Sequence, residues 1–273
     1  QMCIRDRDTT DRNRTSPFAF TGNKFEFRML GSAMNIACAN IMLNTAVAES
    51  LRQFADELEG AEDFASASAL LIKREITAHH RILFNGNGYD ASWVTEAEKR
   101  GLSNLRSTPE ALPHYTDDKN VALFERHGVY TRAEMNSRQE IQLEEYAKTI
   151  SIEALTMVDM IRKDILPACV AYVRELSDTA AAAQAIGVDT ATEVSLARTV
   201  SAASADLLAH LTGIENALHC VPADADTAGV AAYYHDTVLA AMEVARADAD
   251  KLETLLPKKL WPFPTYSDLL FYV

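Results

Sequence analysis

The chain has 273 residues, 48% of them hydrophobic, and its 26 Lys and Arg against 39 Asp and Glu give a formal charge of −13. Its 10 glycines and 8 prolines are too few for a collagen or a disordered chain. General nucleic-acid binding requires a basic face, so this acidic balance predicts no nucleic-acid partner.

The cysteines and the apolar runs indicate where the chain resides. The four cysteines lie far apart and form no CxxC pair: Cys3, Cys38, Cys169 and Cys220. This usage argues against a disulfide framework and predicts a reducing, cytoplasmic location. No apolar run reaches about 18 residues, and residues 1–7 lack the apolar stretch of a signal peptide, so we expect no membrane partner.

The clearest regular element near the start of the chain is a short strand. Residues 24–28 alternate between polar and aromatic, which predicts a strand with Phe25 and Phe27 on one face. Glu26 and Arg28 then share the other face. A shorter extended piece precedes this strand, and one pair of short strands is not stable alone. We therefore expect the remaining strands of this sheet to lie outside the sequence.

Helical periodicity replaces the alternation from about Ser32 onward. The first helix carries an apolar stripe whose members lie three, four or seven residues apart: Ile36, Leu43, Val47, Leu51, Phe54 and Leu58. Shorter helices follow as far as residue 127. Residues 8–147 thus read as a mixture of short strands, helices and loops.

Longer helices make up the rest of the chain. Capping boxes at Thr131–Glu134 and Thr190–Glu193 predict helices that reach about residues 176 and 218. Pro167 should kink or break the first of them. A last helix is expected to end before Pro257, which should end all regular structure. The predicted fold is mainly α, with a long-helix bundle over residues 148–257 and an aromatic tail over 258–273.

Chemistry is most strongly indicated at the predicted strand. A carboxylate at Glu26 can hold a hard cation such as Mg²⁺, and the Arg28 guanidinium beside it can bind phosphate oxygens. Arg12 and Arg14 on the preceding loop would add further phosphate contacts. The alternative is a surface strand with an ordinary salt bridge.

Two further pairs have a helical spacing that can bind a metal. They are Glu75 with His79, and Glu215 with His219. Neither pair has an evident third ligand, so solvated helix surface is the favoured interpretation for the first and a helix-end role for the second.

Several strings resemble a known family. Asn13–Ser16 followed by Phe25–Arg28 resembles the late catalytic segment of glutamine synthetases. Other strings resemble the type III enzymes of that family: Asp11–Gly31, Phe84–Tyr89, Glu96–Leu102 and Trp261–Val273. The resemblance covers Asp8 to Val273. Residues 1–7 match nothing expected there and are interpreted as a foreign extension.

The resemblance implies a fold and an activity. The fold would be the C-terminal part of an α+β catalytic domain followed by a helical domain. The intact protein would be a homo-oligomeric ring that joins glutamate to ammonia with ATP and Mg²⁺ or Mn²⁺, through γ-glutamyl phosphate. By resemblance, Glu26 is a metal ligand, Arg28 stabilises the transferring phosphoryl group, and Arg14 lies near the nucleotide phosphates.

Two departures from the family pattern qualify these expectations. The common types carry a second arginine five residues after the loop arginine, where this chain has Ala19. The other metal ligands of the family lie upstream of this segment, so we expect the chain alone to have no ligase activity. The alternative function is a non-catalytic helical oligomerisation or interaction module over residues 131–257.

Overall fold

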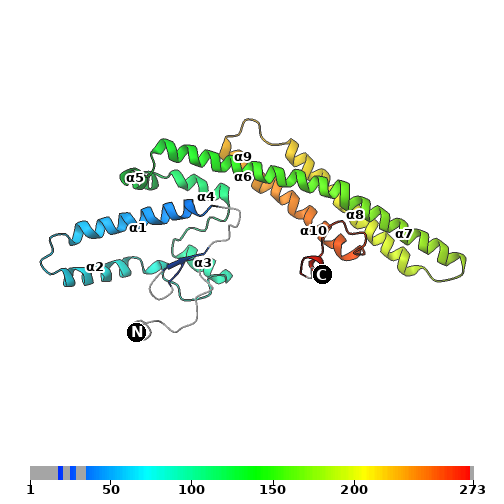
Figure 1. The fold of residues 1–273 in the computed structure, drawn as a ribbon, viewed down its shortest axis with the longest axis horizontal. Coiled ribbons are helices and arrows are strands. Elements are labelled where there is room, and N and C mark those ends of the chain that lie inside the picture. Colours follow the sequence, from blue (N-terminus) through cyan, green and yellow to red (C-terminus); the bar gives the residue numbers. More distant parts are fainter. Residues whose placement is uncertain (1–17, 21–24, 29–34, 271–273) are drawn as a thin grey trace. The chain divides into compact units, whose positions relative to one another are not determined.

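The computed structural model describes residues 18–20, 25–28 and 35–270. The chain divides into two compact units (Figure 1). Unit 1 comprises residues 1–106 and 117–135, and unit 2 comprises residues 107–116 and 136–273.

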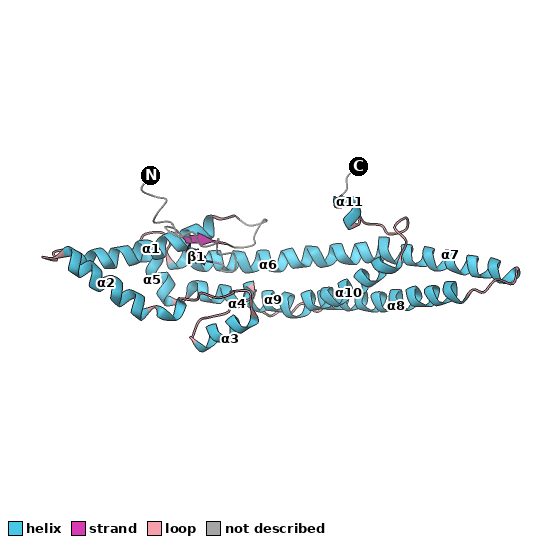
Figure 2. Ribbon diagram, turned by 90° about the horizontal axis from the view of Figure 1, so that it is seen from below, coloured by secondary structure: helices cyan, strands magenta, loops and turns pink. Residues whose placement is uncertain are grey.

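Unit 1 begins with a strand pair. β1 (Phe18–Phe20) runs antiparallel to β2 (Phe25–Phe27), with Ala19 opposite Glu26. These strands are the only β-structure among the described residues, and Figure 2 draws them in magenta. The helical elements of unit 1 are α1 (Ala37–Leu58), α2 (Phe64–Ala78), the 3₁₀-helix η1 (His80–Ile82), α3 (Ala91–Lys99) and α5 (Asp118–Arg126).

Helix α1 is packed in an unusual way. The predicted apolar stripe is only partly covered, because Val47 and Leu51 remain 56% and 60% exposed. The two side chains that α1 buries are instead polar, Thr45 and Glu49. Within unit 1, α1 contacts α2 and α5. Polar contacts therefore contribute strongly to how this helix is held in the described part of the unit.

Two of the strings that carry the family resemblance meet in unit 1. Phe84 stacks on Trp93 with ring centroids 3.9 Å apart, and the Arg100 guanidinium lies 5.4 Å from the Trp93 ring centroid. Arg100 also donates to the main-chain oxygens of Arg81 (3.3 Å) and Leu83 (2.9 Å). The aromatic stack and the guanidinium thus tie the turn that begins at residue 84 to α3.

Unit 2 is built from long helices. Its elements are α4 (Thr108–Ala111), the 3₁₀-helix η2 (Leu112–Thr116), α6 (Arg132–Met160, whose first turn belongs to unit 1), the π-helix η3 (Ile161–Ile165), α7 (Leu166–Ala185), α8 (Ala191–His219), α9 (Thr227–Tyr233), the π-helix η4 (Tyr234–Leu239), α10 (Ala240–Leu255) and α11 (Tyr266–Leu270). α8 packs against both α7 and α10. The mainly-α fold expected from the sequence is confirmed.

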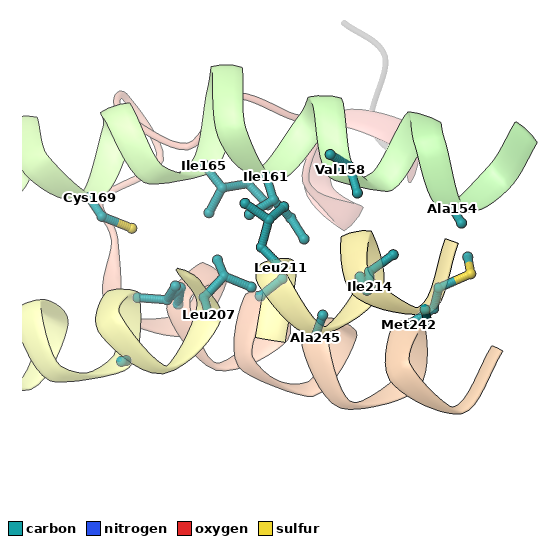
Figure 3. Packing of buried hydrophobic residues seen from close by; sticks show 14 of the residues in the cluster. Ala154, Val158, Ile161, Ile165, Cys169, Leu207, Leu211, Ile214, Met242 and Ala245 are labelled. Carbon is teal, nitrogen blue, oxygen red and sulfur yellow. The ribbon is translucent and has the colours of Figure 1, made fainter. Parts of the chain in front are cut away.

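One apolar core joins the helices of unit 2 (Figure 3). Figure 3 shows Ile161 and Ile165 directed toward Leu207 and Leu211 of α8. The buried members are Ile150, Ala154, Val158, Ile161, Ile165, Cys169, Val200, Ala203, Leu207, Leu211, Ile214, Ala217, Val238, Met242, Ala245, Ala249, Leu252 and Leu256. Trp261 and Phe263 of the tail pack against this core, as their aromatic character predicts.

The predicted helix starts are correct in one case and wrong in detail in the other. At Thr131 the capping box forms, since the Glu134 N–H donates to Thr131 Oγ1 (3.3 Å) and the Thr131 N–H donates to Glu134 Oε2 (2.8 Å). At Thr190 no side-chain cap forms. The neighbouring Asp189 carboxylate accepts the Ala191 N–H instead (3.2 Å).

Pro167 does not break the long helix; of the predicted kink or break, the structure shows an interruption of the α-helical pattern just before the proline. The helix passes through η3 just before the proline, where the Leu166 N–H donates to the Ile161 oxygen five residues back. Pro167 then lies at the start of α7. The wider π turn accommodates a residue that has no N–H to donate.

Pro257 ends α10 but not all regular structure, because α11 follows. Asp268 caps α11 by accepting the Thr265 N–H at 2.9 Å. Across the part of the chain that the structure describes, no helix combines the length and the apolarity that a bilayer crossing requires.

Truncation of Leu211 should destabilise unit 2 strongly. Leu211 is 1% exposed, so Leu211→Ala should lower the free energy of unfolding by about 2–5 kcal/mol. The change is measured by urea unfolding followed through Trp261, in a Trp93→Phe background. Leu208→Ala on the same helix is the matched control: Leu208 is 50% exposed, and its change should stay below about 0.5 kcal/mol. Equal losses in the two variants would contradict the assignment of this core.

Candidate functional site

Glu26 and Arg28 contact each other at the end of β2. Arg28 donates from Nη2 and from Nε to the same carboxylate oxygen, Glu26 Oε2, at 2.7 and 3.1 Å. The Arg28 and Glu26 side chains are 26% and 29% exposed. The two groups thus lie side by side on one face of the strand, as the period-two alternation predicts.

The position opposite Glu26 is occupied by a small residue. Ala19 pairs with Glu26 across the two strands and is almost fully buried. Directly opposed residues of an antiparallel pair share a face, so Ala19 lies on the face that carries the ion pair. Phe25 and Phe27 on the other face are exposed. The polar face of the strand pair is therefore the more covered one.

This arrangement has a definite chemical capacity. A guanidinium that donates two hydrogen bonds to a carboxylate fixes the direction of that carboxylate. Carboxylate oxygens are ligands that Mg²⁺ prefers, and the planar guanidinium matches phosphate oxygens. A magnesium-bound phosphate could thus exchange with the ion pair, the cation at Glu26 and the phosphate oxygens at Arg28.

Comparison with known proteins places the chain in a family. Residues 67–184 match the family model of the glutamine synthetase C-terminal domain. The chain is 37% identical to a glutamine synthetase of Butyrivibrio fibrisolvens, over 97% of the chain and 38% of that protein. It is also 37% identical to a type-3 glutamine synthetase of Dictyostelium discoideum, over 97% of the chain and 37% of that protein. This chain belongs to the glutamine synthetase family.

A third relative agrees with this placement. A glutamine synthetase of Bacteroides fragilis (strain YCH46) is 34% identical over 97% of the chain and 38% of that protein. The resemblance to glutamine synthetases, with a type-3 enzyme among the relatives, is confirmed. The chain spans less than two fifths of the length of these relatives.

The two other residues predicted for the site, Arg12 and Arg14, belong to the predicted loop before β1. Arg12 and Arg14 lie outside the described residues, so their place beside the strand stays a prediction. Among the described residues, no group of three or more His, Cys, Asp or Glu side chains could hold a metal. Glu26 alone still fits as one ligand, because Mg²⁺ is commonly held by one or two carboxylates together with substrate phosphates.

The two helical pairs with metal-like spacing make ordinary contacts. His79 Nε2 lies 3.3 Å from Glu75 Oε2 on the surface of α2. Glu215 accepts two hydrogen bonds from Arg162, at 2.7 and 2.8 Å. The first contact agrees with the surface interpretation, whereas Glu215 pairs with another helical element, so the helix-end role of the second pair stays a prediction.

Unit 1 contains a second polar cluster, which the sequence did not predict. The buried carboxylate of Glu49 accepts from Gln53 (2.7 Å), His127 (2.8 Å), Arg52 (3.0 and 3.2 Å) and Arg126. We call these five residues the Glu49 cluster. Arg126 and His127 lie 77 and 78 residues from Glu49 along the chain, so no local pattern points to the contact.

The charge of Glu49 is strongly favoured by its partners. Hydrogen bonds from Arg52, then from Gln53 and His127, together with the Arg126 charge, hold the pKa of Glu49 far below its ordinary value. Burial acts in the opposite direction and is outweighed. The carboxylate is therefore ionised throughout the neutral and mildly acidic range.

Acid should weaken unit 1 through this carboxylate. The pKa of Glu49 is about 4.3 in the unfolded chain and lower in the folded one. Its contribution to the stability of unit 1 is therefore complete above that pH and is lost as the pH falls below it. Glu49→Gln should lower the urea concentration at the midpoint of unfolding at pH 7. Between pH 5 and 3 this midpoint should fall less steeply in the variant than in the parent. Unfolding is followed through Trp93 in a Trp261→Phe background. Parallel pH curves for the variant and the parent would contradict this role.

Proposed function

We propose that this chain contributes the late catalytic segment of a type III glutamine synthetase, an ATP-dependent ligase that joins glutamate and ammonia. The observation that carries the proposal is the contact between Glu26 and Arg28 on one strand face, in a chain of this family. The proposal extends to cytoplasmic location and to a homo-oligomeric ring for the intact protein.

The reaction has two steps. A γ-carboxylate oxygen of glutamate attacks the γ-phosphorus of ATP, the bond to ADP breaks, and γ-glutamyl phosphate forms. Ammonia then attacks the carbonyl carbon, phosphate leaves, and the nitrogen loses a proton to give glutamine. Phosphoryl transfer needs positioned positive charge more than covalent help.

The residues of β2 would supply that charge. A divalent cation, Mg²⁺ or Mn²⁺, would neutralise charge on the nucleotide phosphates, with Glu26 as one of its ligands. Arg28 would turn its guanidinium from Glu26 to the oxygens of the transferring phosphoryl group, where negative charge must be stabilised. The loop arginines Arg12 and Arg14 would bind the nucleotide phosphates.

Ala19 bears on how this site differs from that of the common types. By resemblance, the common types carry an arginine at this position. Ala19 lies opposite Glu26 and is almost fully buried, so a guanidinium there would point to the same strand face. Either another cation of the type III enzymes, such as Arg12 or Lys24, takes over this charge, or the contact is missing, and we assign the role to no residue.

Loss of either strand residue should abolish most of the activity. In the full-length synthetase, Glu26→Ala should reduce kcat on the order of 10³-fold through the lost metal ligand, and Arg28→Lys on the order of 10²-fold. Lysine keeps the charge but lacks the planar fork. Glutamine formation is measured as ATP-dependent phosphate release in the presence of glutamate and ammonia.

A matched pair on the surface of unit 1 serves as the control. Glu57 and Arg74 form a comparable bidentate pair, at 2.7 and 2.8 Å, between α1 and α2. Glu57→Ala and Arg74→Lys should leave kcat within about twofold, since exposed pairs contribute little. Normal turnover in Glu26→Ala or Arg28→Lys would contradict the proposed roles.

The organisation of the chain is part of the same proposal. Residues 8–147 would belong to the catalytic domain, 148–257 would form the helical C-terminal domain, and 258–273 would form its tail. Residues 1–7, outside the described residues, would be a foreign extension. The alternative function is a non-catalytic helical oligomerisation or interaction module over residues 131–257, a segment that contains neither Glu26 nor Arg28.

The chain by itself should show no ligase activity. Its described residues offer one carboxylate at the site and no cluster of three or more metal-binding side chains. Phosphate release and γ-glutamyl transfer by the purified 273-residue chain should both equal the background. Turnover above background that disappears in Glu26→Ala would refute the claim of inactivity.

A further inference from the structure

Helix α1 turns a polar side toward the end of α5. Glu49, one of the two side chains that α1 buries, accepts hydrogen bonds from Arg126 at the end of α5 and from His127 after it. Successive residues of a helix are rotated by about 100°, so Val47 and Leu51, each two residues from Glu49, lie on the opposite side. The polar side of α1 is therefore the covered one.

The opposite side carries a row of apolar residues that we call the α1 stripe: Ile36, Leu43, Val47 and Leu51. Their spacings of seven, four and four residues keep them on one helix face. Ile36, Val47 and Leu51 are exposed, and Leu43 is half-buried. At 1.5 Å per residue the stripe extends about 22 Å along the helix. The described part of the chain thus leaves most of it uncovered.

This arrangement reverses that of an ordinary surface helix, which buries its apolar side. The Glu49 cluster maintains the reversal, because turning the α1 stripe inward would carry the Glu49 carboxylate away from Arg126 and His127. Apolar side chains gathered on one exposed face, unlike those scattered singly, mark an interaction surface. The α1 stripe is therefore a surface that awaits a partner.

The strand pair is an independent sign that unit 1 is completed by further chain. β1 and β2 have three residues each and form the only sheet among the residues that the structure describes. A pair of short strands is not stable alone in water. The relatives are long enough to supply what is missing, since this chain spans less than two fifths of their length.

The size of the α1 stripe favours an occupant in the same polypeptide over a second copy of the chain. A row about 22 Å long on a helix about 10 Å wide offers on the order of 200 Å². A stable interface between separate proteins takes about 800 Å² from each partner. A tethered segment needs less, because it loses little translational and rotational freedom when it docks.

We propose that the α1 stripe is a docking surface for the part of the same polypeptide that lies outside these 273 residues, and that this part presents an apolar surface to it. The inference rests on the family membership and on the length of the relatives. It assigns the stripe no part in the chemistry of Glu26 and Arg28.

Photo-crosslinking in the full-length synthetase identifies the occupant. With Leu51 replaced by benzoylphenylalanine, irradiation should give a product that still migrates as a single subunit on a denaturing gel. Peptide mass spectrometry should place the crosslinked residue outside residues 8–273. In the matched control the same group replaces Asp56, whose side chain is 62% exposed. Asp56 lies seven residues after Glu49, on the same side of the helix, so it should give no such crosslink.

Thiol labelling gives a second measurement with a smaller substitution. The thiol of Val47→Cys should react with maleimide at least about tenfold more slowly in the full-length synthetase than in the 273-residue chain, because labelling of a covered thiol requires local opening. The thiol of Asp56→Cys should react at similar rates in both. Peptide mass spectrometry measures the labelling at each site separately from that of the natural cysteines.

Each other occupant has its own result, and each of these results overturns the inference. A crosslinked product of twice the subunit mass indicates a second copy. A crosslink to a residue of unit 2 indicates that the chain covers its own stripe. Equal labelling of Val47→Cys in the two proteins, or no crosslink from position 51, indicates that the stripe stays open.

Ligase activity is not among these readouts, so the inference and the proposed function fail separately. An occupied α1 stripe together with normal turnover in Glu26→Ala would refute the proposed function alone. An open stripe together with lost turnover in Glu26→Ala would refute the inference alone.

Discussion

Arg28 donates two hydrogen bonds to one oxygen of Glu26, and the proposed chemistry depends on this contact. Both side chains are partly exposed, and ion pairs of that kind contribute little to stability. Such a pair holds each group oriented, yet would open at small cost if a magnesium-bound phosphate offered a partner to both. The pair is thus well suited to a site that must exchange its contacts during a reaction.

The two units of the chain rest on different interactions. Unit 2 buries a continuous apolar core along α6, α7, α8 and α10, which keeps its long helices together. In unit 1 the helix that follows the candidate site buries Glu49 and leaves much of its apolar stripe exposed. Directional, charge-dependent contacts therefore contribute strongly to how α1 is held in the unit that contains the candidate site.

The sequence predicted what local rules control. Period-two alternation placed Glu26 and Arg28 on one face, and the capping signal at Thr131 located the start of α6. At Pro167 it predicted a kink or a break, and the structure shows a π turn that accommodates the proline without ending the helix. It could not find the Glu49 cluster, because Arg126 and His127 lie 77 and 78 residues from Glu49 and reach it only through tertiary packing. Nor could helical periodicity tell that Val47 and Leu51 would be exposed, because coverage depends on which neighbours pack against the helix.

Cation binding by the full-length protein tests the central claim most directly. Electron paramagnetic resonance of Mn²⁺ in the presence of ATP reports how many ions are bound and how tightly. If Glu26 is a ligand, Glu26→Gln should weaken one bound ion by about tenfold or more while the fold is kept. Identical Mn²⁺ titrations for the variant and the parent would contradict the account.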